Sequence, residues 1–346
     1  MKILAIDGNS ILNRAFYGIR ALSTKDGRFT NGIYGFLTIL MKLSDEVKPD
    51  GVAIAFDLKA PTFRHKMYDG YKANRHGMPP ELAQQLPVLK ELLTALGYKI
   101  LSLEGYEADD ILGTVAKMCE NGNECYIATG DRDSLQLVSD NVSVLLTTTK
   151  LGKTHTVEYT PEVLFKEYGL TPSQMIELKA LQGDNSDNIP GVAGIGPKTA
   201  GELIKKYKNI EAIYENTDAL ETTASVKAKL VAGKDNAFLS KTLGTINLSA
   251  PIETDVSAYL LNEQDKEELK NQLAYHEMFK LLSRLGLDKK DNGTKIKKDE
   301  LKSNITLKLL ASSELADITA DSKEIFFTCL FDENELKAVG ITDEKN

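Results

Sequence analysis

Short apolar runs followed by turn residues recur through the first part of the chain. They lie at 2–7, 51–57, 98–103 and 124–129. Such runs are typical of strands buried on both faces of a parallel sheet. Amphipathic patterns between them predict helices over 31–47, 80–96 and 108–120. This alternation up to about residue 150 indicates an α/β layer structure with a mostly parallel sheet.

Helical patterns dominate from residue 160 to about residue 285. The segments are PEVLFKEYG, PSQMIELKALQ, PKTAGELIKKY and EELKNQLAYHEMFKLLSRLG. A charged, apolar-poor stretch follows, and strand-like runs such as KEIFFTCLF and LKAVGIT come last. We therefore expect an α/β domain over 1–160, a helical region over 161–287, a linker over 288–303 and a tail over 304–346 that is too short to bury a core alone.

Three strand-like runs lead into an aspartate, at Asp7, Asp57 and Asp131. Ligands of open parallel sheets bind at the carboxyl ends of the strands, so we expect these side chains at one edge. Further acids follow at tight spacing in the motifs EADD, GDRD and GDNSD. The acid set comprises Asp7, Asp57, Glu107, Asp109, Asp110, Asp131, Asp133, Asp184 and Asp187. Any one of them alone is more often a turn or helix-capping residue, but like charges gathered together are costly unless cations neutralise them.

Three pairs within the acid set have spacings that would place both members on one side of their segment. The pairs are Glu107 with Asp110 at a helix start, Asp184 with Asp187 if their segment is helical, and Asp131 with Asp133 if theirs is extended. Oxygen ligands without nearby His or Cys select hard cations, Mg²⁺ with Mn²⁺ as a substitute. Since one Mg²⁺ usually takes one or two carboxylates, the set implies two or more ions and favours phosphodiester hydrolysis.

Two further segments have features of phosphate binding. In GVAGIGPKTAG (191–201), glycines permit tight turns before a helix start that could hold a phosphate, although ordinary glycine turns between helices are as common. The candidate residues are Gly191, Gly194, Gly196, Lys198 and Thr199. In the long insertion between Asp57 and Glu81, the cations Arg64, His65, Lys66, Lys72 and Arg75 alternate with Phe63, Tyr68 and Tyr71. Single-strand nucleic-acid sites combine such residues, and the alternative is a solvated loop.

Bulk composition adds little to this picture. The formal net charge of −8 argues at first against a nucleic-acid partner, but the acid set alone accounts for the deficit. Cys119, Cys125 and Cys329 form no CxxC pair, which fits a reducing compartment. No stretch approaches the roughly 20 apolar residues of a membrane span. We expect a cytoplasmic protein without membrane segments.

Together the motifs resemble a known family over about 1–285. IDGNSILNRAF, AFD, YKANR, EGYEADDILGT, TGDRDSLQLV and LQGDNSDNIPGVAGIGPKTA are similar, in order and spacing, to the 5′-nuclease domain of bacterial DNA polymerase I, within the flap endonuclease family. The resemblance implies a PIN-like α/β fold with a helical arch above the metals and a helix-hairpin-helix that grips duplex DNA. It implies a monomeric 5′→3′ exonuclease and flap endonuclease that acts on DNA with 5′ flaps, nicks or single-stranded 5′ ends in primer removal, replication and repair.

The resemblance also implies roles for single residues. Asp7, Asp57, Glu107 and Asp109 would carry a first metal, and Asp131, Asp133, Asp184 and Asp187 a second, with Asp110 shared or acting through water. Tyr71 would stack on a terminal nucleotide, while Lys72, Arg75 and Arg14 would contact phosphates. The segment 304–346 would be the truncated start of a degenerate 3′–5′ exonuclease-like domain, because Thr328 and Leu330 stand where that family has a metal-binding Asp-x-Glu pair. No polymerase motif occurs in the chain, so we expect no nucleotide polymerisation from it.

Two other interpretations compete with a DNA nuclease. A PIN-type ribonuclease would share the acids but would need neither the helix-hairpin-helix nor an insertion of this length. A catalytically silent DNA-binding module would show gaps in the acid set, and the sequence has none.

Overall fold

The computed structural model describes residues 1–75, 77–120, 122–150, 153–288, 325–332 and 335–343. The chain forms two compact units, 1–289 and 290–346. In the second unit, β7 (Ile325–Asp332) and β8 (Glu335–Asp343) pair as an antiparallel hairpin, while the predicted linker after Asp288 lies outside the described residues. Within the described part of the chain, no helix is both long and apolar enough to cross a bilayer.

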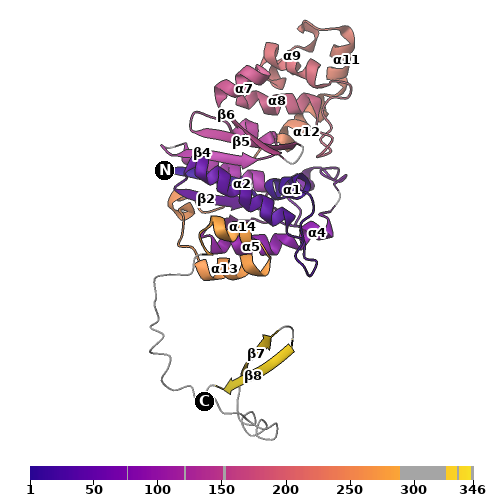
Figure 1. Ribbon diagram of the computed structural model, residues 1–346. Coiled ribbons are helices and arrows are strands. Elements are labelled where there is room, and N and C mark those ends of the chain that lie inside the picture. Colours follow the sequence, from indigo (N-terminus) through magenta and orange to yellow (C-terminus); the bar gives the residue numbers. More distant parts are fainter. Residues whose placement is uncertain (76, 121, 151–152, 289–324, 333–334, 344–346) are drawn as a thin grey trace. The chain divides into compact units, whose positions relative to one another are not determined.

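A six-stranded sheet forms the centre of the first unit (Figure 1). Its strands are β1 (Lys2–Asp7), β2 (Gly51–Ala55), β3 (Lys99–Leu101), β4 (Glu124–Thr129), β5 (Val142–Lys150) and β6 (Lys153–Tyr159). The order is β3-β2-β1-β4-β5-β6, with every neighbouring pair parallel except β5 and β6. The predicted mostly parallel sheet is confirmed, and β5 and β6 extend it beyond the strands that the apolar runs indicated.

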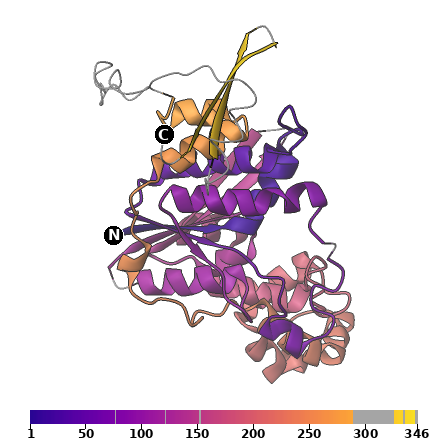
Figure 2. The ribbon, with the colours of Figure 1, turned by 90° about the horizontal axis from the view of Figure 1, so that it is seen from below.

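Helices cover both faces of this sheet (Figure 2). They are α1 (Gly8–Gly18), α2 (Asn31–Val47), α4 (Pro80–Ala83), α5 (Gln85–Ala95), α6 (Ala108–Cys119), α13 (Lys266–Tyr275) and α14 (Phe279–Arg284). Side chains alternate along β1, so Leu4 and Ile6 join a core with α1, α2, α5, α13 and α14, whereas Ile3 and Ala5 join a second core with α6. The continuous apolar run of β1 therefore serves two cores.

Two predicted helices are each broken into two. The helix expected over 80–96 divides at Gln84, because Pro87 has no N–H for the Ala83 carbonyl and its ring would clash with that group. The helical pattern at 267–286 divides where Glu277 adopts a left-handed conformation (φ 54°). That turn folds α14 back, and Leu281 of α14 joins Leu273 of α13 in the first core.

The rest of the helical region has a core of its own. It contains α7 (Pro161–Tyr168), α8 (Pro172–Gln182), α9 (Pro197–Tyr207), α10 (Ile210–Glu215), α11 (Ala224–Ala232) and α12 (Lys234–Gly244). Proline at the first position starts α7, α8 and α9, where its missing N–H costs no helical bond. In the arch segment (residues 58–79), the described residues form one helix, α3 (Phe63–Met67), followed by turns, so the expected helical arch has little helix here.

Candidate active site

The carboxyl ends of β1 and β4 bring Asp7 and Asp131 together through one threonine. Asp7 caps α1, accepting the Ser10 N–H at 2.9 Å on Oδ1, and accepts the Thr129 hydroxyl at 2.9 Å on Oδ2. The same hydroxyl accepts the Asp131 N–H at 3.0 Å. Asp7 is therefore both a helix cap, as its residue type alone suggested, and a member of a carboxylate cluster.

Asp57 and Asp109 approach this edge from β2 and α6. Asp57 accepts the Ala108 N–H at 2.8 Å at the start of α6, which fixes that helix beside β2. Burial raises the pKa of Asp109 well above its ordinary value, and the negative charges of Asp7 and Asp131 raise it further. Burial, followed by the charges of Asp57 and Asp131, similarly raises the pKa of Asp7 to about 7. Full ionisation of these acids therefore costs free energy that a bound cation would offset.

A second group of acids lies next to the first. Carboxylate oxygens of Asp133, Asp184 and Asp187 all lie within 4.8 Å of one another. A helix was considered for Asp184 and Asp187, and an extended segment for Asp131 and Asp133, and neither conformation occurs. Asp184 and Asp187 lie in a turn that the Asp184–Ile189 backbone pair closes, at 2.9 and 2.8 Å, and Asp133 begins a short 3₁₀ helix. The turn still directs both aspartates toward Asp133.

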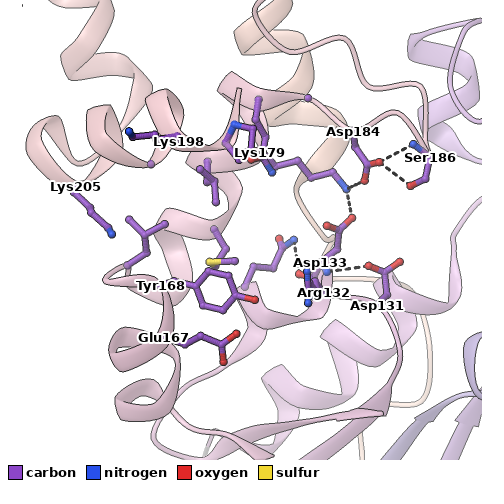
Figure 3. Close-up of a pocket in the computed structure, with 18 of the residues that line it drawn as sticks. Asp131, Arg132, Asp133, Glu167, Tyr168, Lys179, Asp184, Ser186, Lys198 and Lys205 are labelled. Atoms are coloured by element: carbon purple, nitrogen blue, oxygen red, sulfur yellow. Dashed lines mark hydrogen bonds and ion pairs between the residues drawn. The ribbon is translucent and has the colours of Figure 1, made fainter. Parts of the chain in front are cut away.

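Lys179 of α8 is a site residue that the sequence did not indicate. Its side chain contacts Asp133 and lies 2.8 Å from an Asp184 oxygen (Figure 3). Although burial alone would lower the pKa of Lys179, these two carboxylates raise it above its ordinary value. Burial raises the pKa of Asp133 to about 6 despite Lys179, whereas hydrogen bonds from Lys179 and Ser186 outweigh burial and lower the pKa of Asp184 to about 2. A lysine within a helical pattern normally points to solvent, so spacing carries no signal for this role.

The arch segment reaches the acids through Tyr71, Lys72 and Arg75. Lys72 Nζ lies 2.6 Å from Glu107 Oε1 and 3.8 Å from Asp187 Oδ2, and Arg75 pairs with Asp187. The Tyr71 hydroxyl donates to Glu107 Oε2 at 2.9 Å, and its side chain is buried. Tyr71 therefore holds a carboxylate in this structure and does not present its ring for nucleotide stacking.

Asp110 faces away from this cluster, into a contact with Arg64. Arg64 donates to both Asp110 oxygens at 2.8 Å, and the N–H groups of Glu107 (3.0 Å) and Asn247 (2.8 Å) donate to Asp110 as well. Both residues are buried. Each Asp110 oxygen thus already accepts two hydrogen bonds, whereas Asp110 was expected to be shared between metals or to act through water. Arg64 was expected in a nucleic-acid site or a solvated loop, and it is buried instead.

Arg14 of α1 passes over the backbone at Gly130. Its Nη2 donates to the Gly130 carbonyl at 2.6 Å, while its buried Nε has no partner among the described residues. A Cβ on Gly130 would lie 1.7 Å from that Nε, so only glycine leaves room for the guanidinium. The guanidinium is thereby held beside Asp131 and Asp7, whose negative charges partly offset the lowering of its pKa by burial.

A groove of about 990 Å³ joins the acids to the helical region. Asp131, Asp133 and Asp184 line one part of it, and Lys198 and Lys205 of α9 line another (Figure 3). The candidate glycines shape the turn before α9. Gly191 (φ 59°) and Gly194 (φ 77°) are left-handed, Gly196 caps the helix, and Lys198 and Thr199 lie in its first turn. Cations and carboxylates therefore face one continuous cavity.

Comparison with known proteins identifies related chains over most of this sequence. The family model "5′-3′ exonuclease, N-terminal resolvase-like domain" matches residues 2–169, and "5′-3′ exonuclease, C-terminal SAM fold" matches residues 170–267. DNA polymerase I of Caldicellulosiruptor bescii is 44% identical over 288 residues, 83% of this chain and 34% of that protein. DNA polymerase I of Bacillus subtilis is 40% identical over 321 residues, 92% of this chain and 35% of that protein. The chain spans about a third of the length of these relatives.

Solved structures share the fold at lower identity. A T5 5′-exonuclease with bound divalent metal ions (zinc) has a TM-score of 0.59 and 22% identity, covering 71% of this chain and 90% of that one. The catalytic core of Rad2 in complex with a DNA substrate has a TM-score of 0.57 and 19% identity, covering 82% and 92%. The two family models follow one another without a gap, and they bracket the acids, the arch segment and the groove. The chain belongs to the 5′-3′ exonuclease family of nucleases.

Proposed function

We propose that the chain is a divalent-metal-dependent, structure-specific 5′ nuclease that hydrolyses phosphodiester bonds in DNA. The observation that carries this proposal is the convergence of acids from separate segments at one sheet edge, beside a groove with basic residues. The residues fit hard cations on two grounds. The clustered ligand atoms are carboxylate oxygens, and burial with like charge raises the pKa of Asp7 to about 7.

We propose Mg²⁺ as the natural metal, in two or more ions, with Mn²⁺ able to substitute. Asp7, Asp57, Glu107 and Asp109 would hold one ion, and Asp131, Asp133, Asp184 and Asp187 another. Such ions, when bound, supply an activated water and neutralise charge on the phosphate. Asp110 has a different role in this proposal, since Arg64 occupies both of its oxygens.

The chain's own cations would bind and orient the substrate. Arg14 is held on the Gly130 carbonyl beside Asp131 and Asp7, and Lys72 and Arg75 reach the same acids from the arch segment, so these three would contact phosphates near the cleaved bond. Tyr71 would orient Glu107. The turn with Gly191, Gly194 and Gly196, followed by Lys198 and Thr199, would hold the duplex backbone at the start of α9.

The substrate class follows from the family and the groove. DNA with 5′ flaps, nicks or single-stranded 5′ ends offers a duplex for α9 and a free end for the arch segment. We propose that the chain acts as a cytoplasmic monomer in primer removal, replication and repair. We further propose a nuclease domain over 1–160, a DNA-binding region over 161–287, a linker over 288–303 and a degenerate 3′–5′ exonuclease-like segment over 304–346.

End-labelled 5′-flap duplex DNA tests this function. With Mg²⁺ we expect cleavage near the flap junction, and with EDTA or with Asp109→Ala we expect none. Absence of a metal-dependent product would overturn the assignment. An RNA flap of the same sequence distinguishes the ribonuclease alternative, which predicts faster cleavage of RNA than of DNA.

A further inference from the structure

Arg64 is the most extensively bonded cation in the described part of the chain, and substrate binding does not explain it. Its side chain is buried. Nε donates to the Leu243 carbonyl at 2.9 Å, and Nη2 donates to the Thr245 carbonyl at 2.9 Å. Nη1 donates to Glu107 Oε2 at 3.1 Å, and two further bonds of 2.8 Å go to Asp110. Since a guanidinium has five N–H donors, every one is used inside the protein.

These bonds join three segments that are far apart in the sequence. Arg64 lies on α3 at the base of the arch segment, Glu107 and Asp110 start α6, and Leu243 and Thr245 end α12 of the helical region. Asp110 strengthens the junction, because it also accepts the backbone N–H groups of Glu107 and Asn247. The three segments therefore meet at one planar, charged group.

The junction determines how Glu107 is presented. Arg64 and Tyr71 both donate to Oε2 of Glu107, at 3.1 and 2.9 Å. The other oxygen, Oε1, is 2.6 Å from Lys72 Nζ, on the side where Asp187 lies. One oxygen is thus anchored in the interior and the other is directed to the acid cluster.

We propose that Arg64 is a positioning residue for the metal centre, fixing Glu107 Oε1 toward the cluster and tying that orientation to the end of α12. The proposal rests on the proposed metal-dependent function. Groups that orient a metal ligand typically change metal affinity or activity by about 10- to 100-fold when lost. A merely structural Arg64 would alter stability and leave the affinity of the folded protein for metal unchanged.

Arg64→Lys is the primary test, because it keeps the buried charge paired but supplies three donors for five acceptors. Mn²⁺ binding to the metal-free full chain is measured from the electron paramagnetic resonance signal of free Mn²⁺, well below the melting temperature recorded by circular dichroism. We expect about 10- to 100-fold weaker Mn²⁺ binding. The double variant Arg64→Met/Asp110→Asn, which leaves no unpaired buried charge, should show the same loss.

Lys241→Met is the matched control. Lys241 also joins two carboxylates, Glu177 at 2.6 Å and Glu211 at 2.7 Å, but neither belongs to the acid set. The Lys241→Met substitution should lower the melting temperature and leave the Mn²⁺ affinity unchanged. Folded Arg64→Lys with the affinity of the unmodified protein would overturn the positioning role. If the unmodified protein itself binds no Mn²⁺, the metal-dependent function fails instead, so the two failures are distinguishable.

Discussion

Gly130→Ala should impair cleavage by displacing Arg14, without disrupting the fold. The added Cβ would lie 1.7 Å from Arg14 Nε and 2.5 Å from its Cζ, so the guanidinium must leave its present position. Gly130 does not have a positive φ, so alanine adds no backbone strain of that kind. The 2.6 Å bond from Arg14 Nη2 to the Gly130 carbonyl, which holds the guanidinium beside Asp131 and Asp7, is then lost.

The size of the effect follows from one charge-assisted contact. A hydrogen bond to a charged group contributes about 1.5–3 kcal/mol, which corresponds to roughly a 10- to 150-fold loss of kcat/KM. Single-turnover cleavage of a 5′-flap duplex measures this loss, and circular dichroism checks the fold.

A double-variant comparison tests the stated cause. If Gly130→Ala acts through Arg14, then Gly130→Ala/Arg14→Ala should be no slower than Arg14→Ala alone, because the same interaction cannot be lost twice. Additive losses would refute the reasoning, and so would a Gly130→Ala protein with unchanged cleavage.

Three other predictions concern Lys72, the buried acids and the C-terminal unit. Lys72→Ala should slow single-turnover cleavage more than it weakens duplex binding in a fluorescence anisotropy titration, because Lys72 lies at Glu107; equal losses would make it only a DNA anchor. In the metal-free fold the pKa of Asp7 is raised from 3.8 to about 7. Between these two pH values the folded protein holds a proton that the unfolded chain releases, so the free energy of unfolding should fall as pH rises. The loss of stability from ionising Asp7 is at most about 4 kcal/mol. Because Mg²⁺ would offset this loss, it should raise the melting temperature more at about pH 8 than at about pH 5, and equal shifts at the two pH values would contradict the prediction. Deleting 304–346 should leave flap cleavage intact, whereas a large loss would show that this segment completes the nuclease.

The sequence predicted the sheet edge well because two simple patterns coincide there. The apolar run of β1 is buried on both faces and ends in the polar Asp7, so the position of Asp7 at the carboxyl end of a strand follows from the order of residues. The strand β5 was missed because Ser143 interrupts its short apolar part, VSVLL, and the TTTK end that follows is polar.

Side-chain partnerships were harder to predict than the fold. Arg64, Lys66 and Arg75 look alike in the arch sequence, yet Arg64 is buried and the other two are exposed. The difference comes from Leu243 and Thr245, which lie far along the chain and offer their carbonyls to Arg64. Lys179 is similar, since its burial depends on the turn that holds Asp184. Local patterns carry no information on such distant contacts.

The segment at Tyr259 and Leu260 packs against Gly51 of β2, and this long-range contact has a consequence for synthesis on the ribosome. Gly51 forms a β-bridge with Leu260, and a Cβ on Gly51 would lie 2.3 Å from the Tyr259 carbonyl oxygen, so this segment packs directly against the sheet. Leu273 of α13 and Leu281 of α14 complete the core on α5. Contacts of such long sequence separation form late. The nascent chain can therefore complete its nuclease core only after α14 has left the exit tunnel, and until then the partly finished sheet exposes apolar surface that chaperones would recognise.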